Sequence, residues 1–154
     1  MIDIEIEAGA WTTAEPDAAG LAAAAAEAAA RLGGGGSIAI LLTDDDAMRR
    51  LNHRFRGQDA STNVLAFPAA ANARDHLGDI ALAFGVCARE AAEQDKALGD
   101  HLRHLVIHGV LHLLGYDHQV EDQARRMEEI ERRLLAVLGV ADPYAEGDHV
   151  QHRR

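Results

Sequence analysis

The sequence predicts a small α/β (α+β) fold in which roughly four strands pack with about five helices. Apolar and acidic residues alternate over residues 1–7, and residues 37–42 form an almost continuous apolar run; both patterns are typical of strands. Residues 102–114 are largely apolar apart from their histidines, which indicates a helix in the core. With 154 residues, 48% of them hydrophobic, the chain is large enough for one core but not for two.

A first helix is predicted over residues 17–32, because this stretch is rich in alanine, the residue with the highest helix propensity. Asp17 is expected to cap its N-terminus, and Gly33 is expected to end it. The four glycines at 33–36 lack the lysine of a phosphate-binding P-loop. We therefore interpret them as a flexible connection to the strand at 37–42.

The next helix is expected to begin after Thr43 and to run to about Phe55. Its start offers a hydroxyl group for capping, from Thr43, and three acids at the positive end of the helix dipole, Asp44, Asp45 and Asp46. Three adjacent aspartates could also bind a metal ion. Helix capping explains them without one.

The rest of the chain predicts two strands and three helices. The strands are expected at residues 63–67, where Pro68 ends the apolar run, and at 78–84, with a loop over 69–76 between them. The helices are expected at residues 86–97, 100–114 and 121–138.

Three histidines at the end of the predicted core helix have the spacing of a metal site. His108 and His112 are four residues apart, so they lie one turn apart on the same helix face. Gly115 is expected to end the helix, which lets the chain turn back and bring His118 to the same place. Three neutral imidazoles suit Zn²⁺. Because no fourth protein ligand is evident nearby, they predict one catalytic rather than structural zinc ion.

The alternative is that these histidines bind no metal. Two histidines on a helix are often only solvated or hydrogen-bonded, and a chain with nine histidines will sometimes place two at this spacing by chance. Here the surrounding helix is apolar, so the imidazoles lie in or beside the core and need partners. We therefore favour the metal site.

Hydrolysis is the expected reaction class, because zinc with an open coordination position activates water and polarises phosphoryl or carbonyl oxygens. The histidine spacing is also that of the metzincin peptidases. Gly109 stands where those enzymes carry their glutamate base, so peptide hydrolysis is disfavoured.

Residues 108–118, HGVLHLLGYDH, resemble the HGxLHLxGYDH signature of the YbeY family, bacterial zinc-dependent endoribonucleases implicated in ribosomal RNA maturation and ribosome quality control. Residues 52–68, 77–80 and 142–144 resemble three further blocks of that family. The resemblance implies a mixed sheet, with the metal site at the C-terminal end of a core helix. The zinc ligands that it implies are His108, His112 and His118.

The resemblance implies a zinc-dependent, single-strand-specific endoribonuclease that acts in ribosomal RNA maturation, at the 3′ end of 16S ribosomal RNA, and in ribosome quality control. The expected partners are ribosomal RNA and the ribosome or its proteins. Arg56 is the expected catalytic residue, because it matches the family's arginine and a guanidinium can stabilise charge that develops on a phosphate. Arg54, two residues earlier, is expected to point elsewhere on the helix. Either water or the substrate's 2′-hydroxyl could attack with these same residues.

Two other functions stay open. The first is a non-catalytic, ribosome-associated factor in which zinc only holds the helix and the following loop together. The second is a zinc-dependent amide or peptide hydrolase, which Gly109 disfavours.

Three further residues could support the site. His104 lies one turn before His108 and could contact substrate or a ligand, although a solvated or core histidine would look the same. Asp117 could orient the imidazole of His118, or it could belong to the turn alone. Asp79 could play a similar supporting role from the sheet.

The formal net charge of −10 argues against strong binding of nucleic acid. A cleft with zinc and a few arginines can still be locally positive, and all but one of the fifteen basic residues are arginine. We expect weak, salt-sensitive affinity for free RNA.

The organisation of the chain is expected to be simple, with a single zinc hydrolase-like domain over residues 1–147 and a disordered tail over 148–154. Cys87, the single cysteine, is expected to be a buried thiol in a reducing compartment. No stretch suggests a signal peptide, a membrane span or a site for an organic cofactor. We therefore expect a cytoplasmic protein.

Overall fold

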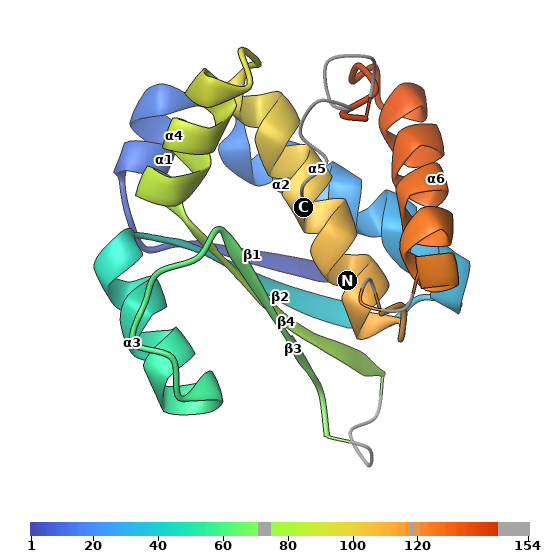
Figure 1. Ribbon diagram of the computed structural model, residues 1–154, viewed down its shortest axis with the longest axis horizontal. Coiled ribbons are helices and arrows are strands. Elements are labelled where there is room, and N and C mark those ends of the chain that lie inside the picture. Colours follow the sequence, from blue (N-terminus) through green and yellow to red (C-terminus); the bar gives the residue numbers. More distant parts are fainter. Residues whose placement is uncertain (71–74, 118, 120, 145–154) are drawn as a thin grey trace.

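The computed structural model describes residues 1–70, 75–117, 119 and 121–144, which form a four-stranded sheet, six α-helices and a short 3₁₀ helix (Figure 1). The strands are β1 (Ile2–Ile6), β2 (Ser37–Thr43), β3 (Val64–Pro68) and β4 (His76–Ala83). The helices are α1 (Ala10–Ala14), α2 (Ala18–Ala30), α3 (Asp45–Arg56), α4 (Phe84–Glu93), α5 (Leu98–Leu113) and α6 (Glu121–Val137). The 3₁₀ helix, Arg31–Gly33, extends α2.

The sheet is mixed and has the strand order β1-β2-β4-β3. Strands β1, β2 and β4 are parallel, whereas β3 runs antiparallel to β4. The mixed sheet that the resemblance implied is therefore confirmed. Because β3 pairs only with β4 in this order, it forms one edge of the sheet.

The helices cover the two faces of the sheet unequally. Helices α1, α2, α4, α5 and α6 lie over one face of the sheet. Among the helices that the structure describes, α3 alone lies over the other face (Figure 1). The main core lies beneath the larger group and includes Trp11, Ile38, Ile40, Leu42, Ile80, Leu82 and the apolar faces of α2 and α5. A smaller core beneath α3 contains Met48, Leu65, Ala81 and Ala83.

Helix α5 lies close to the sheet because its residue opposite Ile80 is a glycine. A Cβ atom added at Gly109 would lie 3.1 Å from Ile80 Cδ1, a distance that requires the isoleucine to move. The glycine therefore lets α5 approach β4 closely. This packing fixes the position of the helix that carries the predicted metal ligands.

The sequence predicted about five helices, and the structure adds the short helix α1. This helix has only five residues, too few for a helical period to be evident. It is held by Trp11, which is completely buried and whose Nε1 donates a hydrogen bond to the Thr43 carbonyl oxygen at 2.9 Å. A tertiary contact, rather than local propensity, accounts for this helix.

The predicted start of α3 after Thr43 is confirmed, but the capping side chain is Asp44 rather than Thr43. Asp44 is the N-cap, and its Oδ1 accepts a hydrogen bond from the Ala47 amide at 2.8 Å. Thr43 instead ends β2, and its hydroxyl donates to Glu7 at 2.5 Å. Asp45 accepts from the Val86 amide at 3.1 Å, so this aspartate links α3 to α4.

Three expectations about the rest of the chain have different outcomes. Cys87 is fully buried, as predicted, and burial raises the pKa of its thiol. No helix in the described part of the chain is long and apolar enough to cross a bilayer. The tail predicted at residues 148–154 lies outside the described residues.

A substitution at Gly78 tests the close packing of β4 against β3 and α5. Gly78 has φ +152°, and an added Cβ would overlap the Phe67 carbonyl oxygen and lie 2.7 Å from Leu113 Cδ2. We expect Gly78→Ala to lower the free energy of unfolding by about 2 kcal/mol, the usual scale of overpacking. Urea denaturation measures this difference.

The matched control is Gly9→Ala. Gly9 has φ −62°, and an added Cβ would meet nothing within 4 Å. The control should lie within about 0.5 kcal/mol of the wild type. Equal unfolding midpoints for the two alanine variants would contradict the packing described here.

Candidate metal centre

Helix α5 places His108 and His112 on one face, as their spacing predicted. Their Nε2 atoms lie 3.1 Å apart, and the ring centroids lie 4.7 Å apart. The helix ends at Leu113 and Gly115 has φ +104°, so the predicted helix stop is confirmed. The chain then folds back, with the Tyr116 amide donating to the Leu111 carbonyl oxygen at 3.1 Å.

The other nitrogen of each imidazole binds a group that can only accept a hydrogen bond. His108 Nδ1 lies 2.7 Å from Glu131 Oε2, and His112 Nδ1 lies 3.1 Å from the Tyr116 carbonyl oxygen. Each Nδ1 must therefore carry the proton. In the neutral rings the lone pairs are then on the two Nε2 atoms that face each other.

This arrangement of donor atoms fits a metal ion. Two lone pairs 3.1 Å apart repel each other unless a metal ion or a shared proton lies between them. Two nitrogens bound to one tetrahedral Zn²⁺ at about 2.0 to 2.1 Å would lie about 3.3 Å apart, close to the observed distance. His108 and His112 therefore have the orientation that a shared metal ion requires.

The third predicted ligand, His118, lies outside the described residues. Among the residues that the structure does describe, no group of three or more His, Cys, Asp or Glu side chains could hold a metal ion. The complete set of three ligands thus stays a prediction.

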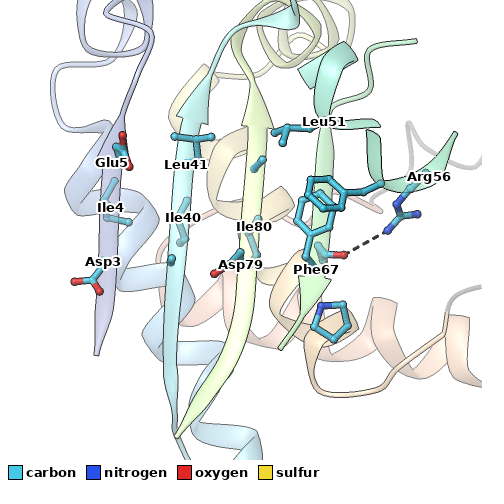
Figure 2. A pocket seen from close by; sticks show the side chains of 15 residues that line it. Asp3, Ile4, Glu5, Ile40, Leu41, Leu51, Arg56, Phe67, Asp79 and Ile80 are labelled. Atoms are coloured by element: carbon cyan, nitrogen blue, oxygen red, sulfur yellow. Dashed lines mark hydrogen bonds between the residues drawn. The ribbon is translucent and has the colours of Figure 1, made fainter. Parts of the chain in front are cut away.

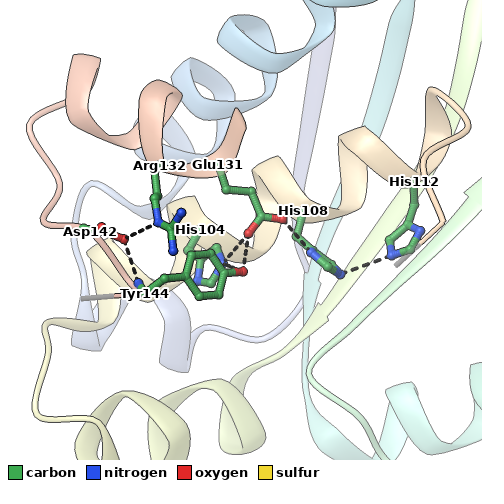
Figure 3. Close-up of polar contacts among 7 residues, drawn as sticks. All are labelled: His104, His108, His112, Glu131, Arg132, Asp142 and Tyr144. Atoms are coloured by element: carbon green, nitrogen blue, oxygen red, sulfur yellow. Dashed lines mark hydrogen bonds and ion pairs between the residues drawn. The ribbon is translucent and has the colours of Figure 1, made fainter. Parts of the chain in front are cut away.

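Glu131 of α6 joins this site, and the sequence analysis did not identify it (Figure 3). Its side chain is completely buried. Oε2 accepts from His108, while Oε1 accepts from His104 Nε2 at 2.9 Å and from the Tyr144 hydroxyl. Burial raises the pKa of this carboxyl, but the hydrogen bonds from His104 and His108 outweigh burial and lower it to about 2. The group is therefore a carboxylate at neutral pH.

A sequence signal for Glu131 does exist. The fully or almost fully buried residues of α6 are Met127, Glu131 and Leu135, four residues apart. A glutamate within the apolar stripe of an amphipathic helix needs a buried partner, because an isolated charge is costly to bury. The pattern could have indicated that Glu131 is buried and has a polar partner, but not which histidines it binds.

Arg56, the predicted catalytic residue, lies at the same pocket as the histidines. This pocket has a volume of about 590 Å³, and its lining includes Arg56, His104, His108, His112 and Tyr144. Arg56 is the last residue of α3, and its Nη2 donates to the Ala66 carbonyl oxygen on the edge strand β3 at 3.3 Å (Figure 2). The structure thus brings together the arginine and the two described histidines from distant parts of the chain.

Asp79 lies elsewhere. It lines a second hollow, of about 1000 Å³, on the sheet face beneath α3 (Figure 2), and its Oδ1 lies 3.0 Å from His76 Nε2. Asp79 does not line the histidine pocket, so it is not placed to support the histidines that the structure describes there. Arg56 lines both hollows.

Asp117 lines the histidine pocket, but its described contact belongs to a turn. Its Oδ1 accepts a hydrogen bond from the Gln119 amide at 2.9 Å. This geometry agrees with the turn interpretation of Asp117. Any contact with His118 lies outside the described residues.

A second carboxylate–histidine pair, in which the histidine is buried and the carboxylate is partly exposed, lies nearer the N-terminus of α5. His101 is only 3% exposed, and its Nε2 lies 2.8 Å from Glu90 Oε1 on α4. Burial lowers the pKa of His101, although its bond to Glu90 opposes this effect. Asn63 also donates to Glu90, at 3.0 Å. Glu90 thus binds His101 through a carboxylate oxygen, as Glu131 binds His104 and His108.

Comparison with known proteins identifies the family. A family model described as endoribonuclease YbeY matches residues 6–139. The endoribonuclease YbeY of Paramagnetospirillum magneticum is 46% identical over 157 aligned positions, which cover 94% of this chain and 96% of that protein. The endoribonuclease YbeY of Maricaulis maris is 63% identical over 98 residues, which cover 64% of this chain and 61% of that protein.

A solved structure agrees with the fold. The solution structure of TM1509 from Thermotoga maritima matches with a TM-score of 0.61 and 26% sequence identity, over 100% of this chain and 96% of that one. The family match covers most of the sequence, and the structural match covers all of it. The chain therefore belongs to the endoribonuclease YbeY family of metal-dependent hydrolases.

Proposed function

We propose that this protein is a zinc-dependent endoribonuclease that cleaves single-stranded RNA in the cytoplasm. Its proposed role is ribosomal RNA maturation, at the 3′ end of 16S ribosomal RNA, and ribosome quality control, with the ribosome or its proteins as partners. One observation carries the proposal: Nε2 of His108 and Nε2 of His112 converge at 3.1 Å in a pocket that Arg56 also lines. Membership of the endoribonuclease YbeY family supports RNA as the substrate.

The proposed ligands of one Zn²⁺ ion are His108, His112 and His118. When bound, zinc would polarise a phosphoryl oxygen and activate a nucleophile. The hydrogen bonds that His108 donates to Glu131 and that His112 donates to the Tyr116 carbonyl fix the tautomers of both rings, so that both Nε2 atoms can act as ligands.

Arg56 is the proposed catalytic residue. Its planar guanidinium can bind two phosphate oxygens at once and can stabilise the extra negative charge that develops as the phosphodiester is attacked. The bond from Nη2 to the Ala66 carbonyl holds the side chain against the edge of the sheet, beside the histidine pocket. The protein thus restricts the orientation of the arginine before substrate binds.

The packing of Gly109 supports a nuclease rather than a peptidase. The glutamate base of a metzincin would replace this glycine, but the Cβ at this position would lie against Ile80, 3.1 Å from its Cδ1. A side chain at position 109 would therefore start in the core between α5 and β4. This sequence therefore lacks the glutamate base that peptide hydrolysis needs, and a side chain in its place would push against Ile80.

The first prediction compares His112→Ala with Arg56→Ala on a fluorescent single-stranded fragment from the 3′ end of 16S ribosomal RNA. Both variants should lose cleavage, by at least about 100-fold, the usual effect of removing one group that stabilises the transition state. Only His112→Ala should also lose zinc, because Arg56 is not a ligand. Cleavage rates and metal content measured on the same preparations test both statements.

Arg54→Ala is the matched control for the arginine. Arg54 belongs to the same helix, but its guanidinium lies 5.3 Å from the centroid of the Phe55 ring and it does not line the histidine pocket. This variant should cleave RNA like the wild type. Full activity in Arg56→Ala, or equal loss in Arg54→Ala, would contradict the role of Arg56, and chelator-resistant cleavage would contradict the role of zinc.

Arg56 should also affect how the affinity for RNA depends on salt concentration. If Arg56 binds a phosphate, Arg56→Ala should reduce the slope of log affinity against log salt concentration by about 0.7, the value for one contact with a single strand. Fluorescence anisotropy with a 2′-O-methyl RNA, which lacks the free 2′-hydroxyl, measures affinity with less cleavage. An unchanged slope would show that Arg56 does not contact the RNA backbone.

A further inference from the structure

Glu131 connects the metal ligands to the C-terminal part of the chain. Its buried carboxylate binds His108 through one oxygen and both His104 and Tyr144 through the other. We infer that Glu131 is the positioning residue of the metal site: it holds His108 in the tautomer that can bind a metal ion, and it couples metal binding to the docking of α6 and Tyr144. This inference rests on the zinc site proposed above.

The contact with Glu131 sets the tautomer of His108. A carboxylate accepts hydrogen bonds but cannot donate one, so the 2.7 Å contact with Glu131 Oε2 requires a proton on His108 Nδ1. Free imidazole can carry its single proton on either nitrogen. The bond to Glu131 therefore favours the form in which Nε2 has the lone pair and faces His112.

Glu131 also links the site to the C-terminal segment through Tyr144. Tyr144 donates to Glu131, and its ring packs edge-on against His104, with the centroids 5.5 Å apart. Asp142 helps to place Tyr144, because its Oδ1 accepts from the Tyr144 amide at 2.7 Å and lies 3.3 Å from Arg132 Nε (Figure 3). The Glu131 carboxylate thus contacts both the proposed metal ligand, His108, and Tyr144 of the C-terminal segment.

Coupling of this kind acts in both directions. If a correctly placed Glu131 strengthens zinc binding, bound zinc must stabilise the packing of Glu131 to the same extent. Zinc should therefore slow hydrogen exchange in α6 as well as in α5. Metal ligation by α5 and the following turn alone would slow only the α6 amides that exchange through global unfolding, so the amides of α6 that exchange by local opening report the coupling.

The decisive variant is Glu131→Gln. A carboxamide has the shape of the carboxylate but only one acceptor oxygen, while three donors meet at this point, from His104, His108 and Tyr144. If the NH₂ group faces His108, the imidazole must change to the tautomer that cannot bind the metal through Nε2. We expect zinc affinity, measured by competition with a chromophoric chelator, to fall about 10- to 100-fold.

The free energy of unfolding, measured for the zinc-loaded and the metal-free protein, distinguishes a positioning role of Glu131 from a purely structural one. Loss of packing alone lowers the stability of both forms equally, so the stabilisation by zinc stays the same. A positioning role reduces this stabilisation, by about 1.4 kcal/mol for each tenfold loss of affinity at saturating zinc. Glu131→Gln should show the reduction, and an unchanged stabilisation by zinc would overturn the inference.

The matched control is Glu90→Gln. Glu90 also binds a buried histidine of α5, because its Oε1 lies 2.8 Å from His101 Nε2, but neither residue contacts the His108 and His112 pair in any bond described here. This variant should lose some stability in both forms and keep the wild-type affinity for zinc. Equal loss of zinc affinity in the two variants would mean that loosening α5 is sufficient, and would overturn a specific role for Glu131.

A measurement on the metal-free wild type does not depend on whether a variant folds. Long-range ¹H–¹⁵N spectra, recorded about two units above the ordinary imidazole pKa, distinguish the two neutral tautomers. His108 should carry its proton on Nδ1, and a proton on Nε2 would overturn the inference. If the wild type bound no zinc at all, the proposed zinc site would be wrong, yet this spectrum would still decide whether Glu131 sets the tautomer.

Discussion

The close approach of α5 to β4, at Gly109 and Ile80, is the contact on which the rest of the molecule depends. On one side of α5, this contact belongs to the main hydrophobic core. On the other side it holds the histidines above the edge of the sheet, where β3 and Arg56 can reach the same pocket. A larger side chain at position 109 would push against Ile80 and so disturb the contact that positions the histidine pair relative to the arginine.

Helix α5 carries a row of four histidines, and its neighbours supply a partner for each of them. His101 binds Glu90 of α4, His104 and His108 share Glu131 of α6, and His112 binds the carbonyl of Tyr116. Buried imidazoles require such partners, and buried carboxylates require donors in turn. The polar groups of the site therefore also specify how α4 and α6 pack against α5, so the chemistry and the fold depend on the same bonds.

The local parts of this structure could be predicted from the sequence. The pair His108 and His112 follows from helical spacing, and the stop at Gly115 follows from the backbone freedom of glycine. Arg56 could be placed only through the family resemblance, because its proximity to the histidines depends on how α3 meets the sheet edge. Glu131 and Trp11 were missed for a related reason. Each acts through a contact more than twenty residues away in the chain, which neither propensity nor periodicity encodes.

The burial of Cys87 has a practical consequence. It is the single cysteine of the sequence, it is completely buried, and its thiol donates weakly to the Asn63 carbonyl oxygen at 3.6 Å. An alkylating reagent can reach it only when α4 moves away from the core, so the rate of alkylation reports the opening free energy of the native protein. The chain thus contains its own chemical reporter of local unfolding, one helix away from the histidine pocket, and needs no added label.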